Sequence, residues 1–183
     1  MLLWFDAYSG YPPKPESSPM SDEISVLFVC LGNICRSPLA EGVFRHILDE
    51  GGLSDQFLVD SAGTGSWHVG ESPDYRSVRS AATHGVTLTG HARQVQPEDF
   101  RRFEYIVAMD QSNLSHLEQY MDGVGGEAVL CLLREFDPEG GPGEEVPDPY
   151  YGGPNGFEEV YDIVDRSCRA FLDYILKEQG AED

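Results

Sequence analysis

Apolar and polar positions follow two patterns along residues 24–178. Short, mostly apolar runs at 24–29, 57–59, 105–109 and 128–133 are typical of buried parallel strands. Between them, apolar residues recur at steps of three and four. This spacing predicts a helix that ends at Gly51-Gly52, helices over 76–84 and 111–120, and a final long helix through 157–175. In the helix over 76–84, the inward positions are expected to be Val78, Ala81 and Ala82.

The alternation of strands and helices predicts a single α/β domain. We expect a doubly wound sheet of about four parallel strands with helices on both faces, in the flavodoxin-like order 2-1-3-4. Ligands of such sheets bind beyond the carboxyl ends of the strands, so the segment after the first strand is the first place to look for a site. Residues 1–22 are rich in proline and serine without an apolar period, which predicts a flexible leader before a domain over 23–180.

The charge of the chain limits its partners. Its 183 residues include 12 Lys+Arg and 32 Asp+Glu, for a net charge of −20. Nucleic acids and anionic membranes are polyanions that need a basic surface, so neither is an expected partner. A phosphate site remains compatible with this charge, because backbone amides and one arginine can form a small positive pocket. No apolar run approaches the roughly 20 residues of a membrane helix.

The cysteines and the amino terminus indicate a cytoplasmic protein. Residues 1–5 lack the basic flank of a secretory signal. The four cysteines form no C-x-x-C pair and no zinc-type cluster, so we expect free thiols in a reducing cytosol, and no metal site. No cofactor is expected either.

The segment after the first strand combines a cysteine with an arginine six positions later. Between Cys30 and Arg36 the chain can curl so that successive N–H groups form an anion-binding nest. Gly32 permits unusual backbone conformations, and Asn33 tolerates the left-handed region. Ser37 followed by Pro38 predicts the start of a helix, with Ser37 as its N-cap.

This loop predicts phosphate chemistry. The helix N-terminus adds positive potential to the amides, and the guanidinium of Arg36 matches two phosphate oxygens. The same positive surroundings favour the thiolate form of Cys30, which is the nucleophilic form. A Cys-x5-Arg spacing alone is weak evidence, because it can arise by chance; its position between a strand and a helix strengthens it.

A distant acidic loop supplies a candidate acid. A cysteine that attacks a phosphate ester needs an acid to protonate the departing oxygen, and then a base to activate water. Asp148 precedes the last helix and could reach the site. The adjacent Tyr150 and Tyr151 could wall a cleft for an aromatic leaving group.

These segments resemble the low-molecular-weight protein tyrosine phosphatases. The resemblance covers about residues 24–178 and rests on the run 29–38, on 148–151, and on ordered matches at 60–63, 67–70, 72–74, 92–94 and 108–113. It implies an enzyme that hydrolyses phosphotyrosine and small aryl phosphates through a cysteinyl-phosphate intermediate. The implied partners are phosphotyrosine-containing proteins, with inorganic phosphate as product or inhibitor, and a monomer is expected.

The resemblance also implies residue roles. Cys30 would be the nucleophile, Arg36 would bind the phosphoryl oxygens, and Asp148 would be the general acid and then the general base. Ser37 would hydrogen-bond the Cys30 thiolate, and Asn33 would keep the loop in shape. The phosphate-binding residues would be Leu31, Gly32, Asn33, Ile34, Cys35 and Ser37.

The resemblance further implies a substrate cleft and a redox partner. The cleft would be lined by Leu31, Trp67, Tyr150 and Tyr151, with His68 on its variable rim. Cys35 would be able to form a reversible disulfide with Cys30 that protects the nucleophile.

One position departs from the family. Members often carry a histidine two residues before the Ala-Arg-Gln run, where it supports the phosphate loop. This chain has Gly90 there and His91 one step later. Either the loop shifts, or the support is missing or comes from another residue. His91 is expected to be an exposed loop residue.

Three other functions use the same fold or loop. An arsenate reductase of the thiol-relay type needs two more cysteines close together, whereas Cys131 and Cys168 look like core residues. Protein-arginine phosphatases, a branch of the family, place threonine where this chain has Ile34, which favours phosphotyrosine. A non-catalytic phosphate-binding module would need neither the nucleophile nor the acid.

Overall fold

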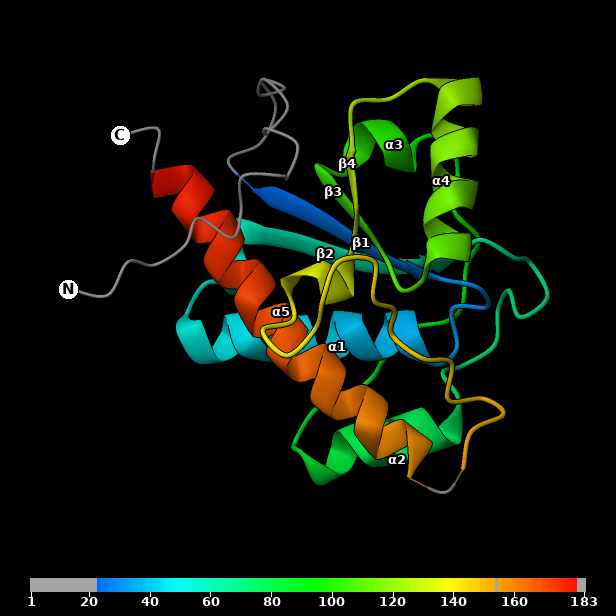
Figure 1. Ribbon diagram of the computed structural model, residues 1–183, viewed down its shortest axis with the longest axis vertical. Coiled ribbons are helices and arrows are strands. Elements are labelled where there is room, and N and C mark those ends of the chain that lie inside the picture. Colours follow the sequence, from blue (N-terminus) through cyan, green and yellow to red (C-terminus); the bar gives the residue numbers. More distant parts are fainter. Residues whose placement is uncertain (1–22, 154, 181–183) are drawn as a thin grey trace.

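The computed structural model describes residues 23–153 and 155–180, so the leader predicted over 1–22 lies outside the described residues. One parallel sheet has the order β2-β1-β3-β4, which confirms the predicted topology (Figure 1). Its strands are β1 (Ile24–Cys30), β2 (Phe57–Gly63), β3 (Tyr105–Ala108) and β4 (Val129–Leu132). The helices are α1 (Arg36–Gly51), α2 (Tyr75–Thr83), α3 (Asp99–Arg102), α4 (Gln111–Val124) and α5 (Gly156–Gly180), with short 3-10 turns at η1 (Ser54–Gln56) and η2 (Leu133–Phe136).

Strand β1 lies at the centre of the sheet and is buried along its whole length. Its alternate side chains enter two separate cores, as the pleat of a strand requires. Val26 and Phe28 join the core under α1 and α5, whereas Leu27 and Val29 join the core under α3 and α4. Figure 1 shows α1, α2 and α5 on one side of the sheet and α3 and α4 on the other. The prediction of helices on both faces is therefore confirmed.

The ends of the first two strands approach each other closely. Strand β2 runs four residues further than the apolar pattern predicts, to Gly63, which pairs with Cys30. A Cβ atom at position 63 would lie 2.8 Å from the backbone oxygen of Leu31, so only glycine permits this approach. The residues that follow β1 and β2 consequently share one edge of the sheet.

Helix α2 differs from its prediction in the face that it buries. Val78 and Ala82 are exposed, while Ser77, Ser80 and Ala81 are buried. The buried hydroxyls are satisfied, because Ser77 donates to the backbone oxygen of Cys35 at 3.0 Å and Ser80 to that of Phe157 at 3.3 Å. Two hydrogen bonds to backbone oxygens thus replace the apolar contacts that the pattern suggested.

Within residues 23–153 and 155–180, no helix combines the length and the apolar character needed to cross a membrane.

Candidate functional site

Cys30 ends β1 at the carboxyl edge of the sheet, and α1 begins six residues later at Arg36. The segment 30–36 is called the phosphate loop below. The Cys30 thiol is only 3% exposed. Its sulfur lies 3.0 Å from the hydroxyl oxygen of Ser37 and accepts a hydrogen bond from the backbone N–H of Asn33 at 3.3 Å. The Asn33 N–H is thus a donor to the sulfur, and the Ser37 hydroxyl can become a second donor once the thiol has lost its proton.

Two details of the loop differ from the sequence prediction. Asn33 lies in the left-handed region with φ of 55°, as the sequence suggested that it could, but Gly32 has no positive φ. A Cβ atom at position 32 would lie 2.9 Å from the imidazole of His68, so a larger residue there would displace that ring. Ser37 is not the N-cap of α1; Cys35 takes that position without a side-chain cap. The Ser37 hydroxyl points to Cys30, so it serves the site and not the helix end.

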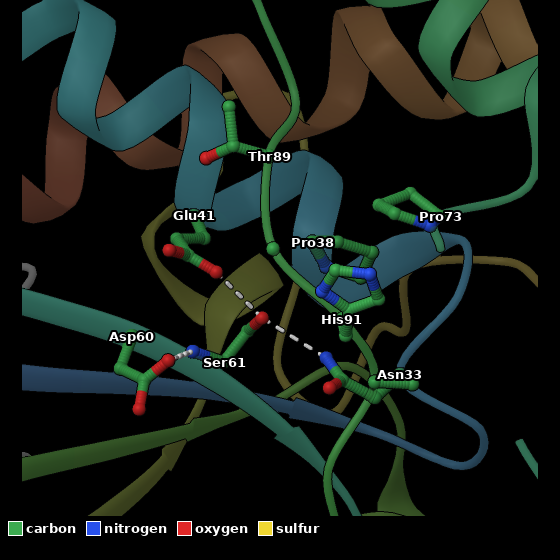
Figure 2. A pocket seen from close by; sticks show the side chains of 10 residues that line it. Asn33, Pro38, Glu41, Asp60, Ser61, Pro73, Thr89 and His91 are labelled. Atoms are coloured by element: carbon green, nitrogen blue, oxygen red, sulfur yellow. Dashed lines mark hydrogen bonds between the residues drawn. The ribbon is translucent and has the colours of Figure 1, made fainter. Parts of the chain in front are cut away.

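A second row of polar residues supports the loop from behind (Figure 2). The side-chain amide of Asn33 donates to the hydroxyls of Ser37 and Ser61, both at 2.9 Å. Its carbonyl oxygen accepts the backbone N–H of Arg93 at 2.9 Å. Ser61 in turn donates to the carboxylate of Glu41 at 2.7 Å. These contacts answer the question raised by Gly90: the loop is supported by Ser61 and the backbone of Arg93, while His91 is exposed, as expected.

The guanidinium of Arg36 is 4% exposed and lies between two carboxylates. It donates to Asp110 at 2.6 Å and to Asp148 at 3.2 Å, and also to the backbone oxygen of Val146 at 3.2 Å. Burial alone would lower the pKa of Arg36, but the negative charges at Cys30, Asp148 and Asp110 raise it above its ordinary value. Arg36 is therefore a fixed positive charge beside Cys30.

Asp110 was not singled out from the sequence, although its segment was among those matched to the family. It lies two residues after the end of β3 and caps α4, because its carboxylate accepts the backbone N–H of Asn113 at 2.7 Å. A carboxylate so soon after the neighbouring strand, at the edge of the sheet where Cys30 ends, was the signal available in the sequence.

The loop that carries Asp148 is fastened to the sheet edge two residues earlier. Val146 is fully buried and donates its backbone N–H to the oxygen of Met109 at 2.8 Å. Asp148 itself is 45% exposed. One of its carboxylate oxygens accepts the backbone N–H of Tyr150 at 3.1 Å, while the other meets Arg36. A buried anchor with an exposed carboxylate allows Asp148 to turn between Arg36 and a bound ligand.

Arg76, which the sequence also did not indicate, joins the acidic loop to α2. Its guanidinium forms a two-pronged pair with Asp74 at 2.8 and 3.0 Å and donates to the backbone oxygen of Tyr150 at 3.2 Å. It also lies 5.1 Å from the ring centre of Tyr150 and 4.7 Å from that of Phe157. The backbone N–H of Asp74 bonds Ile34 in the phosphate loop at 2.7 Å. This group thus ties the acidic loop to the phosphate loop.

The predicted cleft residues form two separate contact groups. Tyr150 and Tyr151 contact each other edge to face at 4.8 Å, and Tyr151 is 93% exposed. Trp67 is 71% exposed and covers Gly65, whose N–H bonds the backbone oxygen of Leu31. His68 lies over Gly32 and pairs with Glu71 at 2.8 Å. Exposed aromatic rings beside the phosphate loop and on the acidic loop are able to pack against an aromatic ester.

The other cysteines have distinct surroundings. Cys35 is buried in a small cluster with Ile34, and its burial, together with the charges of Asp74 and Cys30, raises its pKa to about 12. Cys131 and Cys168 lie in the main core, and burial raises the pKa of each thiol well above its ordinary value. Both are core residues, as expected, and their burial does not fit the mobile thiols that an arsenate reductase of the thiol-relay type needs.

A parallel sheet whose first strand ends on a buried cysteine, with an arginine and a carboxylate beside it, places the protein in the class of α/β proteins with a Cys-x5-Arg loop. A family model described as low molecular weight phosphotyrosine protein phosphatase matches residues 25–181. The enzyme of that name from Sus scrofa is 45% identical over 152 residues, which are 82% of this chain and 95% of the relative. The chain belongs to the low molecular weight phosphotyrosine protein phosphatase family.

Solved structures agree with this assignment. A protein tyrosine phosphatase from Entamoeba histolytica, with Hepes in its active site, superposes with a TM-score of 0.77 at 36% identity, over 86% of this chain and 99% of the other. A drosophila arginine phosphatase superposes with a TM-score of 0.75, also at 36% identity, over 82% of this chain and 96% of the other. The fold is thus shared by relatives whose names give two different phosphorylated residues.

Proposed function

We propose that the protein hydrolyses phosphotyrosine in proteins, and small aryl phosphates, through a cysteinyl-phosphate intermediate. One observation carries this proposal. The buried sulfur of Cys30, the guanidinium of Arg36 and the carboxylate of Asp148 meet at one edge of the sheet, with Arg36 and Asp148 only 3.2 Å apart. Nucleophile, phosphate-binding cation and acid are the three groups that the reaction needs.

The first step would transfer the phosphoryl group to sulfur. The thiolate of Cys30 attacks phosphorus, and the bond between phosphorus and the tyrosine oxygen breaks. The carboxyl group of Asp148 gives its proton to that oxygen, so that tyrosine leaves as a neutral phenol. Arg36 and the loop amides hold the phosphoryl oxygens, and Ser37 donates its hydroxyl hydrogen to the sulfur.

The second step would return the enzyme to its starting state. The carboxylate of Asp148 removes a proton from water, and the water oxygen attacks phosphorus while the bond between sulfur and phosphorus breaks. Inorganic phosphate and the Cys30 thiolate are the products. The Ser37 hydroxyl, 3.0 Å from the sulfur, makes the thiolate a better leaving group.

The contact between Arg36 and Asp148 is compatible with this cycle. A bound phosphate dianion would compete with Asp148 for Arg36, because both offer oxygens to the same guanidinium. Once released from Arg36, the half-exposed carboxyl group of Asp148 would be able to turn towards the departing oxygen of the substrate. Substrate binding would therefore convert Asp148 from a partner of Arg36 into the acid of the first step.

The test is hydrolysis of p-nitrophenyl phosphate and of a phosphotyrosine peptide, with EDTA present. We expect the wild type to turn over both, Cys30→Ser to be inactive, and Asp148→Asn to lose about 10²- to 10³-fold, chiefly on the peptide, whose leaving group needs the proton. Asp122→Asn, an exposed change of the same kind, is the matched control. A wild type that is inactive on both substrates after thiol reduction would refute the proposal.

Because one similar structure is that of an arginine phosphatase, the assay must also include a phosphoarginine peptide for comparison. Ile34, at the position where threonine marks the arginine-specific branch, is buried against Cys35, Ala92 and Phe157. We therefore expect kcat/KM on a phosphotyrosine peptide to exceed that on a phosphoarginine peptide of the same sequence by at least tenfold, roughly the effect of 1.4 kcal/mol. The reverse order would assign the protein to the other branch.

The remaining parts of the proposal follow from the same site. Inorganic phosphate would be the product and a competitive inhibitor, since it fits the same loop. The reaction requires a reduced Cys30, which fits a protein that acts in the reducing cytoplasm, and the proposed site needs no residue from a second subunit. A Cys30–Cys35 disulfide would protect the nucleophile under oxidation. Loss of recovery from peroxide in Cys35→Ser, without loss of initial activity, would support that protection.

A further inference from the structure

A small pocket lies next to Asn33 of the phosphate loop (Figure 2), and none of the predicted cleft residues lines it. It has a volume of about 80 Å³ and lies between α1, β2 and the segment 89–92. Because one buried water molecule needs roughly 10–15 Å³ of such space, the pocket could hold about five to eight non-hydrogen atoms, which is enough for a small organic ion. Gly90, with φ of 87°, leaves one side open: a Cβ atom there would meet nothing within 4 Å.

The polar groups that line the pocket are mainly acceptors. They include the carboxylates of Glu41 and Asp60 and the hydroxyl of Ser61. Glu41 already pairs with Arg45 at 3.0 Å, and Asp60 pairs with Arg93 at 2.9 Å. A carboxylate has about four lone-pair sites, so both retain acceptor capacity. The pocket therefore suits a ligand that donates several N–H groups.

The electrostatic balance also favours a cation. Arg93 is shared between Asp60 and Asp99, each at 2.9 Å, so three carboxylates in and beside the pocket face two guanidinium groups. The Glu41 side chain is only 16% exposed. Burial, together with the nearby charge of Asp60, raises the pKa of Glu41, although Ser61 and Arg45 act in the opposite direction. One further positive charge would stabilise the ionised carboxylate. His91, on the rim, is the other titratable group there.

A continuous chain of hydrogen bonds leads from this pocket to the nucleophile. Ser61 donates to Glu41 at 2.7 Å and accepts from the Asn33 amide at 2.9 Å. The second hydrogen of that amide goes to Ser37 at 2.9 Å, and Ser37 lies 3.0 Å from the Cys30 sulfur. An ionised Glu41 can only accept, so it takes the Ser61 hydroxyl hydrogen and leaves the lone pairs of Ser61 to accept from the Asn33 amide. A protonated Glu41 could instead donate to Ser61 and occupy one of those lone pairs, which would loosen the hold of Ser61 on Asn33.

We propose that this pocket binds a small organic cation of the amidinium or guanidinium type, and that the bound cation favours catalysis by holding Ser61, Asn33 and Ser37 in the donor order that stabilises the Cys30 thiolate. A planar cation with several N–H groups can bond Glu41 and the neighbouring acceptors at once. The effect on turnover rests on the proposed function; the binding itself does not.

The binding test uses acetamidinium as the probe and neutral acetamide as the control of nearly equal shape. Amide resonances of the ¹⁵N-labelled protein are followed at constant ionic strength, because a chain of charge −20 attracts cations non-specifically. We expect saturable shifts at Glu41, Ser61 and His91 with acetamidinium, with a Kd near the millimolar range typical of so few atoms, and none with acetamide.

Two variants test the location. Thr89 is an exposed residue of the lining, and Thr89→Lys would place an ammonium group in the pocket and abolish the saturable shifts. Glu41→Gln should weaken acetamidinium binding at least tenfold, while Glu50→Gln, an exposed change on the same helix, should not. Equal binding to all variants, or shifts that do not saturate, would overturn the site.

The coupling is tested separately. With acetamidinium bound, kcat on p-nitrophenyl phosphate should rise about 2- to 5-fold, and saturating phosphate should tighten acetamidinium binding several-fold, within the usual range of coupling between two sites. If acetamidinium binds but neither kcat nor its affinity in the presence of phosphate changes, the proposed coupling is wrong, while the proposed binding site stands. Binding to a protein that hydrolyses neither aryl phosphates nor phosphopeptides would contradict the proposed function alone.

Discussion

Replacing Asn33 by alanine should cost the domain a large part of its stability, because one small side chain satisfies three buried partners. It donates to Ser37 and Ser61 and accepts from the backbone of Arg93, all at 2.9 Å. Three lost hydrogen bonds at roughly 1 kcal/mol each, plus about 1–2 kcal/mol for alanine in the left-handed region, give about 4–5 kcal/mol. For a domain of this size the expected fall in Tm is roughly 8–20 °C.

Asn33→Gly separates the two contributions. Glycine loses the same hydrogen bonds but adopts the backbone φ of 55° without strain. Relief of strain gains about 1–2 kcal/mol, and the more flexible unfolded chain takes back about 0.4–1 kcal/mol. The glycine variant should therefore unfold about 2–4 °C above the alanine variant. Both should be nearly inactive, because Ser37 is no longer directed towards Cys30.

The assay is thermal unfolding of the three proteins by circular dichroism, with urea unfolding to obtain the free energies. A fall in stability below about 1 kcal/mol for Asn33→Ala would refute the reasoning, because it would mean that the buried hydroxyls find other partners at no cost. Equal stability of the alanine and glycine variants would refute the argument from strain alone. Wild-type activity in either variant would contradict the link from Asn33 to Cys30.

Three further changes test other contacts of the described residues. Asp110→Asn keeps the cap of α4 but removes a charge 2.6 Å from Arg36, so KM should rise about tenfold with little change in Tm, measured by steady-state kinetics and calorimetry. The side chain of Asp137 is fully buried between two arginines that lower its pKa, in spite of its burial. Asp137→Asn should therefore cost about 3 kcal/mol at pH 7, and this difference should vanish as the pH falls through that lowered pKa, below the ordinary aspartate value of roughly 4. Arg76→Gln should slow phenyl phosphate about tenfold more than p-nitrophenyl phosphate, because only the poorer leaving group depends on a well-placed Asp148; equal losses on both substrates would mean that Arg76 supports the fold alone.

The main elements of the fold could be predicted because apolar periodicity reports burial directly. Strand β1 is buried on both faces, and its run of apolar residues could be interpreted in only one way. Helix α3, with four residues, is too short to show a helical period. The buried face of α2 was predicted correctly at Ala81 but not at Val78 and Ala82. Hydrophobicity alone cannot show that a serine hydroxyl will find a backbone oxygen, as those of Ser77 and Ser80 do.

The candidate site divides in the same way. Cys30, Arg36 and Asp148 could be named because their chemistry is rare and their spacing or position is informative. The tertiary structure does bring them together, as Arg36 contacts Asp148 across 112 positions of sequence. Asp110 could have been inferred from its position after β3. Arg76 could not, since a surface arginine two residues after Asp74 looks like any local ion pair.

The supporting residues show where sequence reasoning reaches its limit. Glu41 and Ser61 are common residue types, and nothing in their local sequence distinguishes them from other polar residues on a helix or a strand. Their importance comes from β2 running to Gly63, which brings Ser61 against Asn33. The proposed nucleophile could therefore be inferred from a nine-residue motif, whereas the hydrogen bonds around it depend on the register of two strands and on the first turns of α1. We therefore expect that chains with the same phosphate loop differ in catalytic rate because of differences in residues such as Ser61 and Glu41, which no sequence motif identifies.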